Sequence, residues 1–69
     1  MNQELALSIG SKIRETRKNN SISQEQLALQ TAIDRSYLGR IERGEVNITV
    51  EKLYQISKTL NVDPKILLP

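Results

Sequence analysis

Apolar residues recur every three or four positions along this chain, and almost nothing in the sequence interrupts that spacing. Such a spacing places the residues on one face of a helix. Two sets show it most clearly: Leu5, Ile9 and Ile13, and Val50, Leu53, Ile56 and Leu60. Both prolines lie in the C-terminal stretch 64–69, only 3 glycines are present, and the weak alternation of residues 46–50 is too short for a useful strand. The sequence therefore predicts an all-α fold.

The small size of the chain limits its stability. We expect its 69 residues to form one domain, spanning 1–69. A domain of this size buries only about 60% of the surface that its unfolded form exposes. The absence of cysteine and histidine removes disulfides and nearly every structural zinc site as additional stabilisers. We therefore expect self-association to contribute to stability.

The composition also narrows the class of function. With no histidine or cysteine, no glycine-rich phosphate loop and scattered carboxylates, the sequence offers no recognisable catalytic pair. We expect a binding protein rather than an enzyme, with no cofactor and no metal ion. The lack of a signal peptide and of a long apolar run predicts a cytoplasmic protein with no membrane partner. Basic clusters at residues 11–18 and 35–43 suit nucleic acid, although solvated helix faces would look the same.

Capping signals divide the chain into five predicted helices. The first three run from about Gln3 to Lys18, from Ser23 to near Gln30, and from Asp34 to just before Gly44. The fourth follows Thr49, and its apolar stripe ends at Leu60. The fifth is a short C-terminal helix that begins at Asp63. Ser23, Asp34, Thr49 and Asp63 are typical N-caps, and Pro64 suits the first position of a helix.

Five further positions predict local geometry. Gly10, inside the first helix, predicts close approach by another helix. Asn19 and Asn20 tolerate left-handed geometry and are expected to end that helix. Gln26, three residues after the cap, completes a capping-box pattern. Ala32 lies in the turn between the second and third helices, where a positive φ would carry a steric cost.

Residues 23–44 have the layout of a helix-turn-helix, although short helical hairpins are also common elsewhere. The strings SQEQLA, from Ser23, and DRSYLGRIERG, from Asp34, resemble the Cro and phage-repressor type of this motif. IRETRK and the tail TVEKLYQISKTLNVDPKILL extend the resemblance from Ile13 to Leu68. Within that XRE-like family, DRSYL, IERG and NIT are most similar to restriction–modification controller proteins. The resemblance implies a compact five-helix, lambda-repressor-like DNA-binding domain.

The second and third helices then supply the candidate DNA contacts. Gln24 lies at a helix N-terminus, which favours phosphate, and Arg35 lies in the turn that reaches base edges, where its guanidinium suits guanine. Tyr37 is expected either to touch DNA or to cover the core. Glu45 and Val46 are poor partners for phosphate. The full set of candidate DNA-binding residues is Ser23, Gln24, Arg35, Ser36, Tyr37, Arg40, Arg43 and Asn47.

Two further sets have structural roles. The resemblance implies that Arg17 and Glu42 form a partly buried ion pair joining the first and third helices. A short C-terminal helix has only one inward face, so its apolar residues and two neighbours are expected to form a dimer interface. The candidate interface residues are Ile48, Val62, Ile66, Leu67 and Leu68.

The sequence thus predicts a dimeric, sequence-specific transcriptional regulator that binds a pseudo-palindromic operator in double-stranded DNA. The controller resemblance implies regulation of its own promoter and of a linked endonuclease gene. Two dimers on adjacent sites and contact with RNA polymerase are further expected assemblies. A phage-type repressor or an antitoxin acting on its own operon is an alternative in the same class. A helical protein-interaction module that binds no DNA is an alternative of another class.

Overall fold

The computed structural model describes residues 3–69, and these form helices and connecting loops with no strand. The elements are α1 (Gln3–Asn19), α2 (Gln24–Thr31), α3 (Arg35–Glu42), α4 (Val50–Thr59) and a 3-10 turn, η1 (Pro64–Leu67). The all-α prediction is confirmed. The fifth predicted helix is instead a short 3-10 helix of four residues, and it ends where Leu68 returns to an extended backbone conformation. No helix among these residues is long and apolar enough to cross a membrane.

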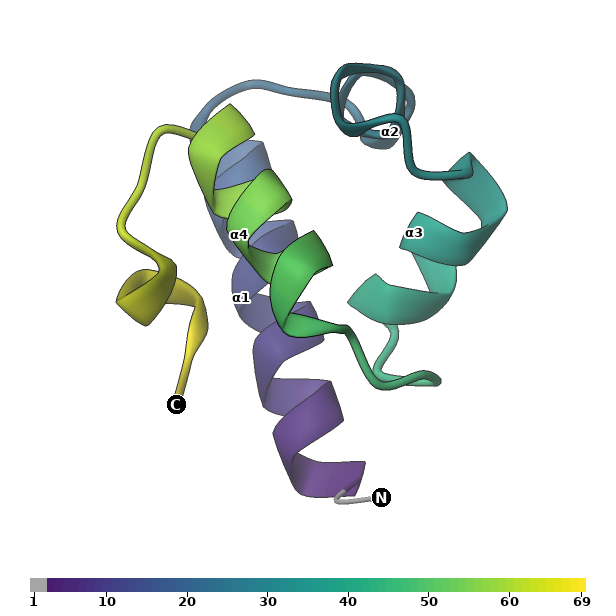
Figure 1. Cartoon of the computed structure of the whole chain (residues 1–69), viewed down its shortest axis with the longest axis vertical. Helices are drawn as coiled ribbons and strands as arrows, with labels where there is room; N and C mark the ends of the chain where they lie inside the picture. The colour runs from purple at the N-terminus through teal and green to yellow at the C-terminus, as the bar shows by residue number, and fades with distance from the viewer. Residues whose placement is uncertain (1–2) are drawn as a thin grey trace.

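The helices surround a common core, and in the view of Figure 1 α4 lies in front of α1. The α2–α3 pair lies on one side of them, and η1 lies on the other. Helix α1 contacts both α3 and η1, while α2 contacts α3 and α4. The Lys12 ammonium also donates a hydrogen bond to the Leu68 carbonyl oxygen at 3.0 Å, which fastens the C-terminal segment to α1.

Each helix after α1 begins at the cap that the sequence predicts. Side-chain oxygens of the caps accept backbone N–H bonds inside the first turn of each element; the caps are Ser23, Asp34, Thr49 and Asp63. Ser23 and Gln26 form a reciprocal capping box, with both bonds present at 3.0 and 2.8 Å. Because capping depends on residues within one turn, the sequence alone determines these boundaries.

All four α-helices end in the same C-terminal hydrogen-bond pattern, the Schellman motif. One residue adopts a left-handed conformation, and the two N–H groups that follow the helix bond back to its last turn. The left-handed residues are Ser21 (φ 56°), Ala32 (φ 57°), Gly44 (φ 73°) and Asn61 (φ 58°). The positive φ predicted as a risk for Ala32 is present. Helix α1 ends at Asn19, as predicted, but the residue in the left-handed conformation is Ser21 rather than Asn19 or Asn20.

The core is built from one face of each helix. Its fully or nearly fully buried side chains are Ile9, Ile13, Leu27, Ala28, Ile33, Leu38, Ile41, Leu53, Ile56, Leu60 and Leu67. Two residues placed on inward stripes by the sequence lie outside this set. Leu5 is 41% exposed because Ala6 takes the inward position of that turn, and Val50 is 71% exposed at the start of α4, before the helix meets the core.

Gly10 lies where α1 meets the end of α3. A Cβ atom built on Gly10 would come 2.3 Å from the Ile41 carbonyl oxygen and 2.8 Å from that of Glu42. No side chain fits there, because the obstructing atoms belong to backbone. The predicted close approach of another helix at Gly10 is therefore confirmed, and it fixes α1 directly against α3.

Candidate nucleic-acid interface

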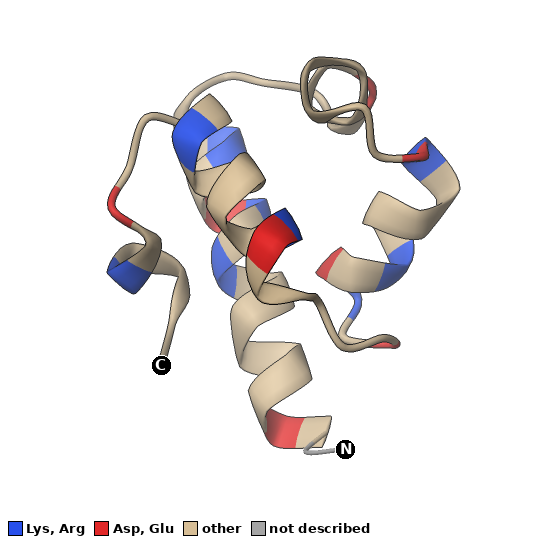
Figure 2. Ribbon diagram, in the orientation of Figure 1, with Lys and Arg blue, Asp and Glu red and all other residues tan. Residues whose placement is uncertain are grey.

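Helix α3 has one buried face and one exposed basic face. Leu38 and Ile41 point into the core, while Arg35, Arg40 and Arg43 are exposed. Figure 2 shows Lys and Arg recurring along the outer side of α3, away from α1 and α4. Ser36 is also exposed, in the first turn of the helix. The element that the sequence identifies as the reading helix therefore presents three guanidinium groups to solvent from a rigid support.

Each of these arginines has a carboxylate beside its Nε atom. Arg35 Nε lies 3.7 Å from Glu25 Oε1, and Arg40 Nε lies 3.8 Å from Glu45 Oε1. Arg43 Nε donates a hydrogen bond to the other oxygen of Glu45. That hydrogen bond lowers the pKa of the Glu45 carboxyl and raises the pKa of the Arg43 guanidinium. Sequence reasoning did not identify either carboxylate as a partner of these arginines.

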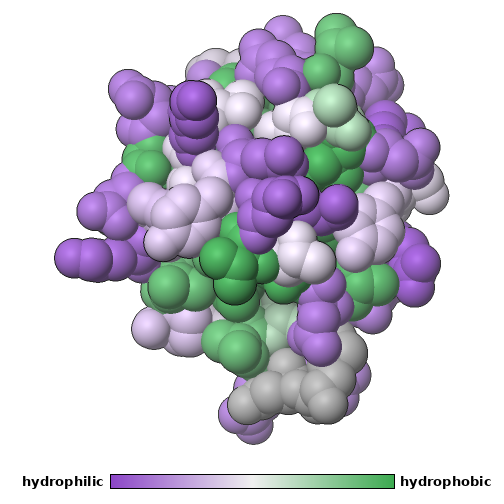
Figure 3. Space-filling view, viewed as in Figure 1, coloured by the Kyte–Doolittle hydropathy of each residue, from purple (hydrophilic) through white to green (hydrophobic). Residues whose placement is uncertain are grey.

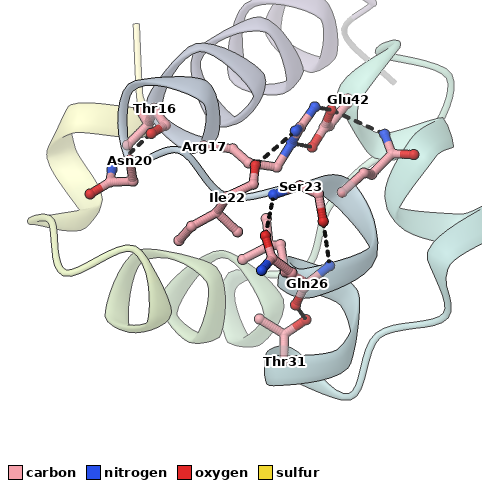
Figure 4. Close-up of polar contacts among 10 residues, drawn as sticks. Thr16, Arg17, Asn20, Ile22, Ser23, Gln26, Thr31 and Glu42 are labelled. Carbon is pink, nitrogen blue, oxygen red and sulfur yellow. Dashed lines mark hydrogen bonds and ion pairs between the residues drawn. The ribbon is translucent and has the colours of Figure 1, made fainter.

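Beneath this surface, Arg17 and Glu42 form a buried, two-bond ion pair between α1 and α3 (Figure 4). Arg17 Nε and Nη2 donate to the two carboxylate oxygens at 2.8 and 3.0 Å, and Nη1 donates to the Ile22 carbonyl oxygen at 3.0 Å. The side chains are only 10% and 3% exposed. The arrangement satisfies both charges, and no buried side-chain nitrogen or oxygen in the described residues lacks a hydrogen-bond partner.

Gln24 belongs to the same network. Its side-chain amide donates a hydrogen bond to Glu42 Oε1 at 3.1 Å, and the residue is only half-exposed. The sequence places Gln24 at the start of α2 as a donor to phosphate, but it does not predict this bond to Glu42. The reason is tertiary: α3 brings Glu42 next to α2 across a contact that residue spacing does not reveal.

Arg14 is a basic residue that the candidate set leaves out. It lines a polar depression together with Gln24, Arg43 and the Arg17–Glu42 pair, at the meeting point of α1, α2 and α3. Arg14 is exposed, so its charge faces solvent beside the arginines of α3. The basic cluster at residues 11–18 indicates that α1 contributes cations, but the sequence alone does not show which of its four cations lies beside the arginines of α3.

The remaining candidates occupy the edges of this surface. The Ser23 hydroxyl oxygen is occupied as a helix cap but stays exposed. Tyr37 is half-buried against the core, and its ring lies 5.9 Å from the Lys52 ammonium, so both predicted roles remain compatible with its position. Asn47 is exposed in the loop after α3, where it lines a groove next to Leu5 and Ile48.

The five residues predicted for a dimer interface divide into three groups. Ile66 and Leu68 are 54% and 39% exposed, while Ile48 and Val62 are half-buried against their own core. Leu67 is completely buried in its own chain and has no surface to offer a partner, so its assignment is wrong. The 3-10 geometry of η1 turns Leu67 inward and its two neighbours outward. Figure 3 shows apolar side chains exposed among charged ones on the viewed face of the molecule.

Among residues 3–69, no group of three or more His, Cys, Asp or Glu side chains is arranged to hold a metal ion. Arginine, serine and amide groups dominate the exposed surface of α2 and α3. These groups donate hydrogen bonds to phosphate oxygens and to the acceptor edges of bases.

Comparisons with known proteins agree with this geometry. The family model described as helix-turn-helix matches residues 13–67. The control protein C.BamHI from Bacillus amyloliquefaciens is 41% identical over 69 residues, covering 99% of this chain and 85% of that protein. The control protein C.SmaI from Serratia marcescens is 43% identical over 56 residues, covering 80% of this chain and 67% of that protein.

A solved structure extends the agreement to three dimensions. The restriction–modification controller protein C.AhdI from Aeromonas hydrophila superposes with a TM-score of 0.88 at 33% identity, covering 91% of this chain and 96% of that one. The family model spans most of the chain, and the similarity to C.BamHI spans nearly all of it. The chain therefore belongs to the helix-turn-helix family of DNA-binding transcriptional regulators, in the group of the restriction–modification control proteins.

Proposed function

We propose that this protein binds a pseudo-palindromic DNA operator as a homodimer and regulates its own promoter together with a linked endonuclease gene. The observation that carries the proposal is the exposed arginine face of α3, which a buried face anchors to the core. A helix presented in this way fits the major groove, with the residues of its first turns against base edges. The similarity to control proteins supports the regulatory role. In this role the protein acts in the cytoplasm and is not an enzyme.

In this proposal the position of each of the three arginines decides whether it contacts a base or a phosphate. Arg35, in the first turn, reads a base edge, with Ser36 and Tyr37 beside it. Arg40 lies farther along the same face and reaches bases, whereas Arg43 reaches phosphate. Each is exposed, so binding DNA requires no refolding of the helix.

Phosphate contacts come from the start of α2 and from α1. Free backbone N–H groups at the α2 N-terminus favour an anion there, next to Ser23 and Gln24. The bond from Gln24 to Glu42 holds its amide in place beside Arg14 and Arg43, which both line the same depression. Asn47, in the loop that follows α3, contacts the backbone from the other side.

Dimer formation is proposed through the surface beside η1 and the ends of α4. Ile66 and Leu68 contribute exposed apolar side chains, and Ile48 and Val62 contribute partly exposed ones. In Figure 1, η1 lies on the side of α1 and α4 opposite α3, so a two-fold axis there leaves both reading helices free. DNA binding and dimerisation would then both reside in residues 1–69. Two dimers on adjacent sites, with RNA polymerase beside them, are the assembly proposed at the promoter.

The test is selection of bound sites from a library of random duplex DNA at low salt. The expected result is a pseudo-palindrome whose half-sites are about 34 Å apart along the duplex, one turn of DNA, because each half-site accepts one α3. A matched selection with the Arg35→Ala variant should recover a degenerate base at one position of each half-site. If no sequence is enriched and no duplex is retained even at low salt, a protein-interaction module replaces the proposed regulator.

A further inference from the structure

Glu45 occupies a position that an apolar residue fills in the three other helices of this fold. In each Schellman motif, the residue after the left-handed one donates its N–H to a carbonyl in the last turn. After α1, α2 and α4 that residue is Ile22, Ile33 and Val62, respectively, and each packs against the core. After α3 it is Glu45, whose N–H bonds to the Arg40 carbonyl oxygen at 2.9 Å while its side chain stays exposed.

The motif therefore places a carboxylate at a fixed point beside the basic face of α3. Gly44, in the left-handed conformation, sets the direction of the chain, and a Cβ there would come 2.6 Å from Leu7, so this turn has little freedom. From it, one Glu45 oxygen faces Arg40 Nε at 3.8 Å and the other accepts the bond from Arg43 Nε. A single carboxylate thus serves two of the three arginines on the reading helix.

The contacts leave the outer edges of both guanidinium groups available. Each uses Nε toward Glu45, so the two Nη atoms remain to donate as a fork, the geometry that fits guanine O6 and N7 or a phosphate. Arg43 Nη1 lies close to Gly39: a Cβ built there would come 3.1 Å from it, so the lack of a side chain at Gly39 leaves room for the guanidinium. Arg43 is thus held at Nε by a carboxylate, with its Nη1 beside the backbone of Gly39.

A carboxylate in this position has opposite effects on the complex with the cognate site and on complexes with non-cognate DNA. An arginine already held in its binding orientation loses less side-chain freedom when it makes its contact in the cognate complex, to a base for Arg40 or to a correctly placed phosphate for Arg43. Conversely, non-specific affinity depends on the number of cations that neutralise phosphates, and a carboxylate beside two of them reduces that number. Orienting the arginines favours the cognate site, and offsetting their charge disfavours every other site.

We propose that Glu45 is a positioning residue that raises the sequence specificity of DNA binding by orienting Arg43 and Arg40 and by offsetting their charge toward non-cognate DNA. The inference rests on the proposed function, since it concerns how the same surface distinguishes one duplex from another. It predicts that removing the carboxylate shifts affinity toward random DNA and away from the selected site.

The experiment compares Glu45→Gln with Glu15→Gln in the full chain. Both changes remove one negative charge, but Glu15 lies on α1 about 200° around the helix from Arg17, which points toward α3. Affinity is measured over a range of salt concentrations for two duplexes of equal length, the selected site and a scrambled sequence. Thermal melts of both variants check that the fold is intact.

With Glu45→Gln we expect tighter binding of the scrambled duplex, with a slope of log affinity against log salt that is steeper by about one. Binding of the selected duplex should not tighten, so the ratio of the two affinities should fall about three- to tenfold. Glu15→Gln should leave the ratio unchanged. Equal gains on both duplexes, or identical behaviour of the two variants, would overturn the inference while leaving the proposed function intact. Failure of the unmodified protein to bind either duplex at low salt would instead remove the proposed function itself.

Discussion

Arg35 is the arginine nearest the N-terminal end of α3, and its side chain is 62% exposed. We predict that Arg35→Ala weakens binding to the selected duplex by about 1–3 kcal/mol, the usual value of a bidentate contact with guanine. Binding to a scrambled duplex should weaken much less, because a base contact contributes little there. Anisotropy titrations against single-base variants of the site provide the measurement. An equal loss on every duplex would assign Arg35 to phosphate rather than to a base.

The ion pair between Arg17 and Glu42 carries the second prediction at this scale. Arg17→Ala or Glu42→Ala alone should lower the free energy of unfolding by about 3 kcal/mol, because each leaves a buried charge without its partner. The double variant should lose clearly less than the sum of the two. Urea unfolding of all four proteins at low temperature measures the cycle. Gln24→Ala is the matched control, with an expected loss of about 1 kcal/mol for one hydrogen bond. Additive losses for the ion pair would contradict the coupling.

The contact between α1 and α3 leaves no room for a side chain at Gly10. We predict that Gly10→Ala destabilises the fold by about 3 kcal/mol or more, because its Cβ would overlap two backbone carbonyl oxygens and force the helices apart. Gly39→Ala is the matched control on α3. There the new Cβ would lie 3.1 Å from Arg43 Nη1 and 3.6 Å from Gln24 Oε1, which are side-chain ends rather than backbone, and alanine is the better helix former by about 1 kcal/mol. Thermal melts should show a large loss for the first variant and none for the second.

The starts of the helices can be predicted from the sequence, whereas most contacts between helices cannot. Helix starts follow from caps such as Ser23 and Thr49, whose hydrogen bonds lie within one turn, so the sequence places them correctly. The Arg17–Glu42 pair was predictable only through the family resemblance, since 25 residues separate its members. The Gln24–Glu42 bond and the two carboxylates beside the α3 arginines depend on how elements meet, and no residue spacing encodes that. The burial of Leu67 likewise depends on a 3-10 turn where an α-helix was expected.

At the scale of the whole molecule, stability and DNA binding depend on the same proposed dimer. A 69-residue domain buries a small core and is correspondingly marginal in stability. Its exposed apolar residues lie on several sides. Two reading helices that act on one palindrome gain affinity only if the subunits are held together. The surface beside η1 is the proposed site of that contact, and Ile66 is its most exposed member among the predicted residues.

We therefore predict that Ile66→Asp gives a folded monomer with much weaker operator binding, because it buries a charge in the proposed interface without disturbing the core. Leu67→Asp should instead unfold the chain, since that side chain is completely buried. Leu29→Asp is the control for surface charge: Leu29 is 84% exposed on α2, away from η1, so this variant should remain dimeric. Sedimentation at micromolar concentration distinguishes the three outcomes. An Ile66→Asp protein that sediments as a dimer would place the two-fold contact on another face, and a monomeric Leu29→Asp protein would place it beside α2.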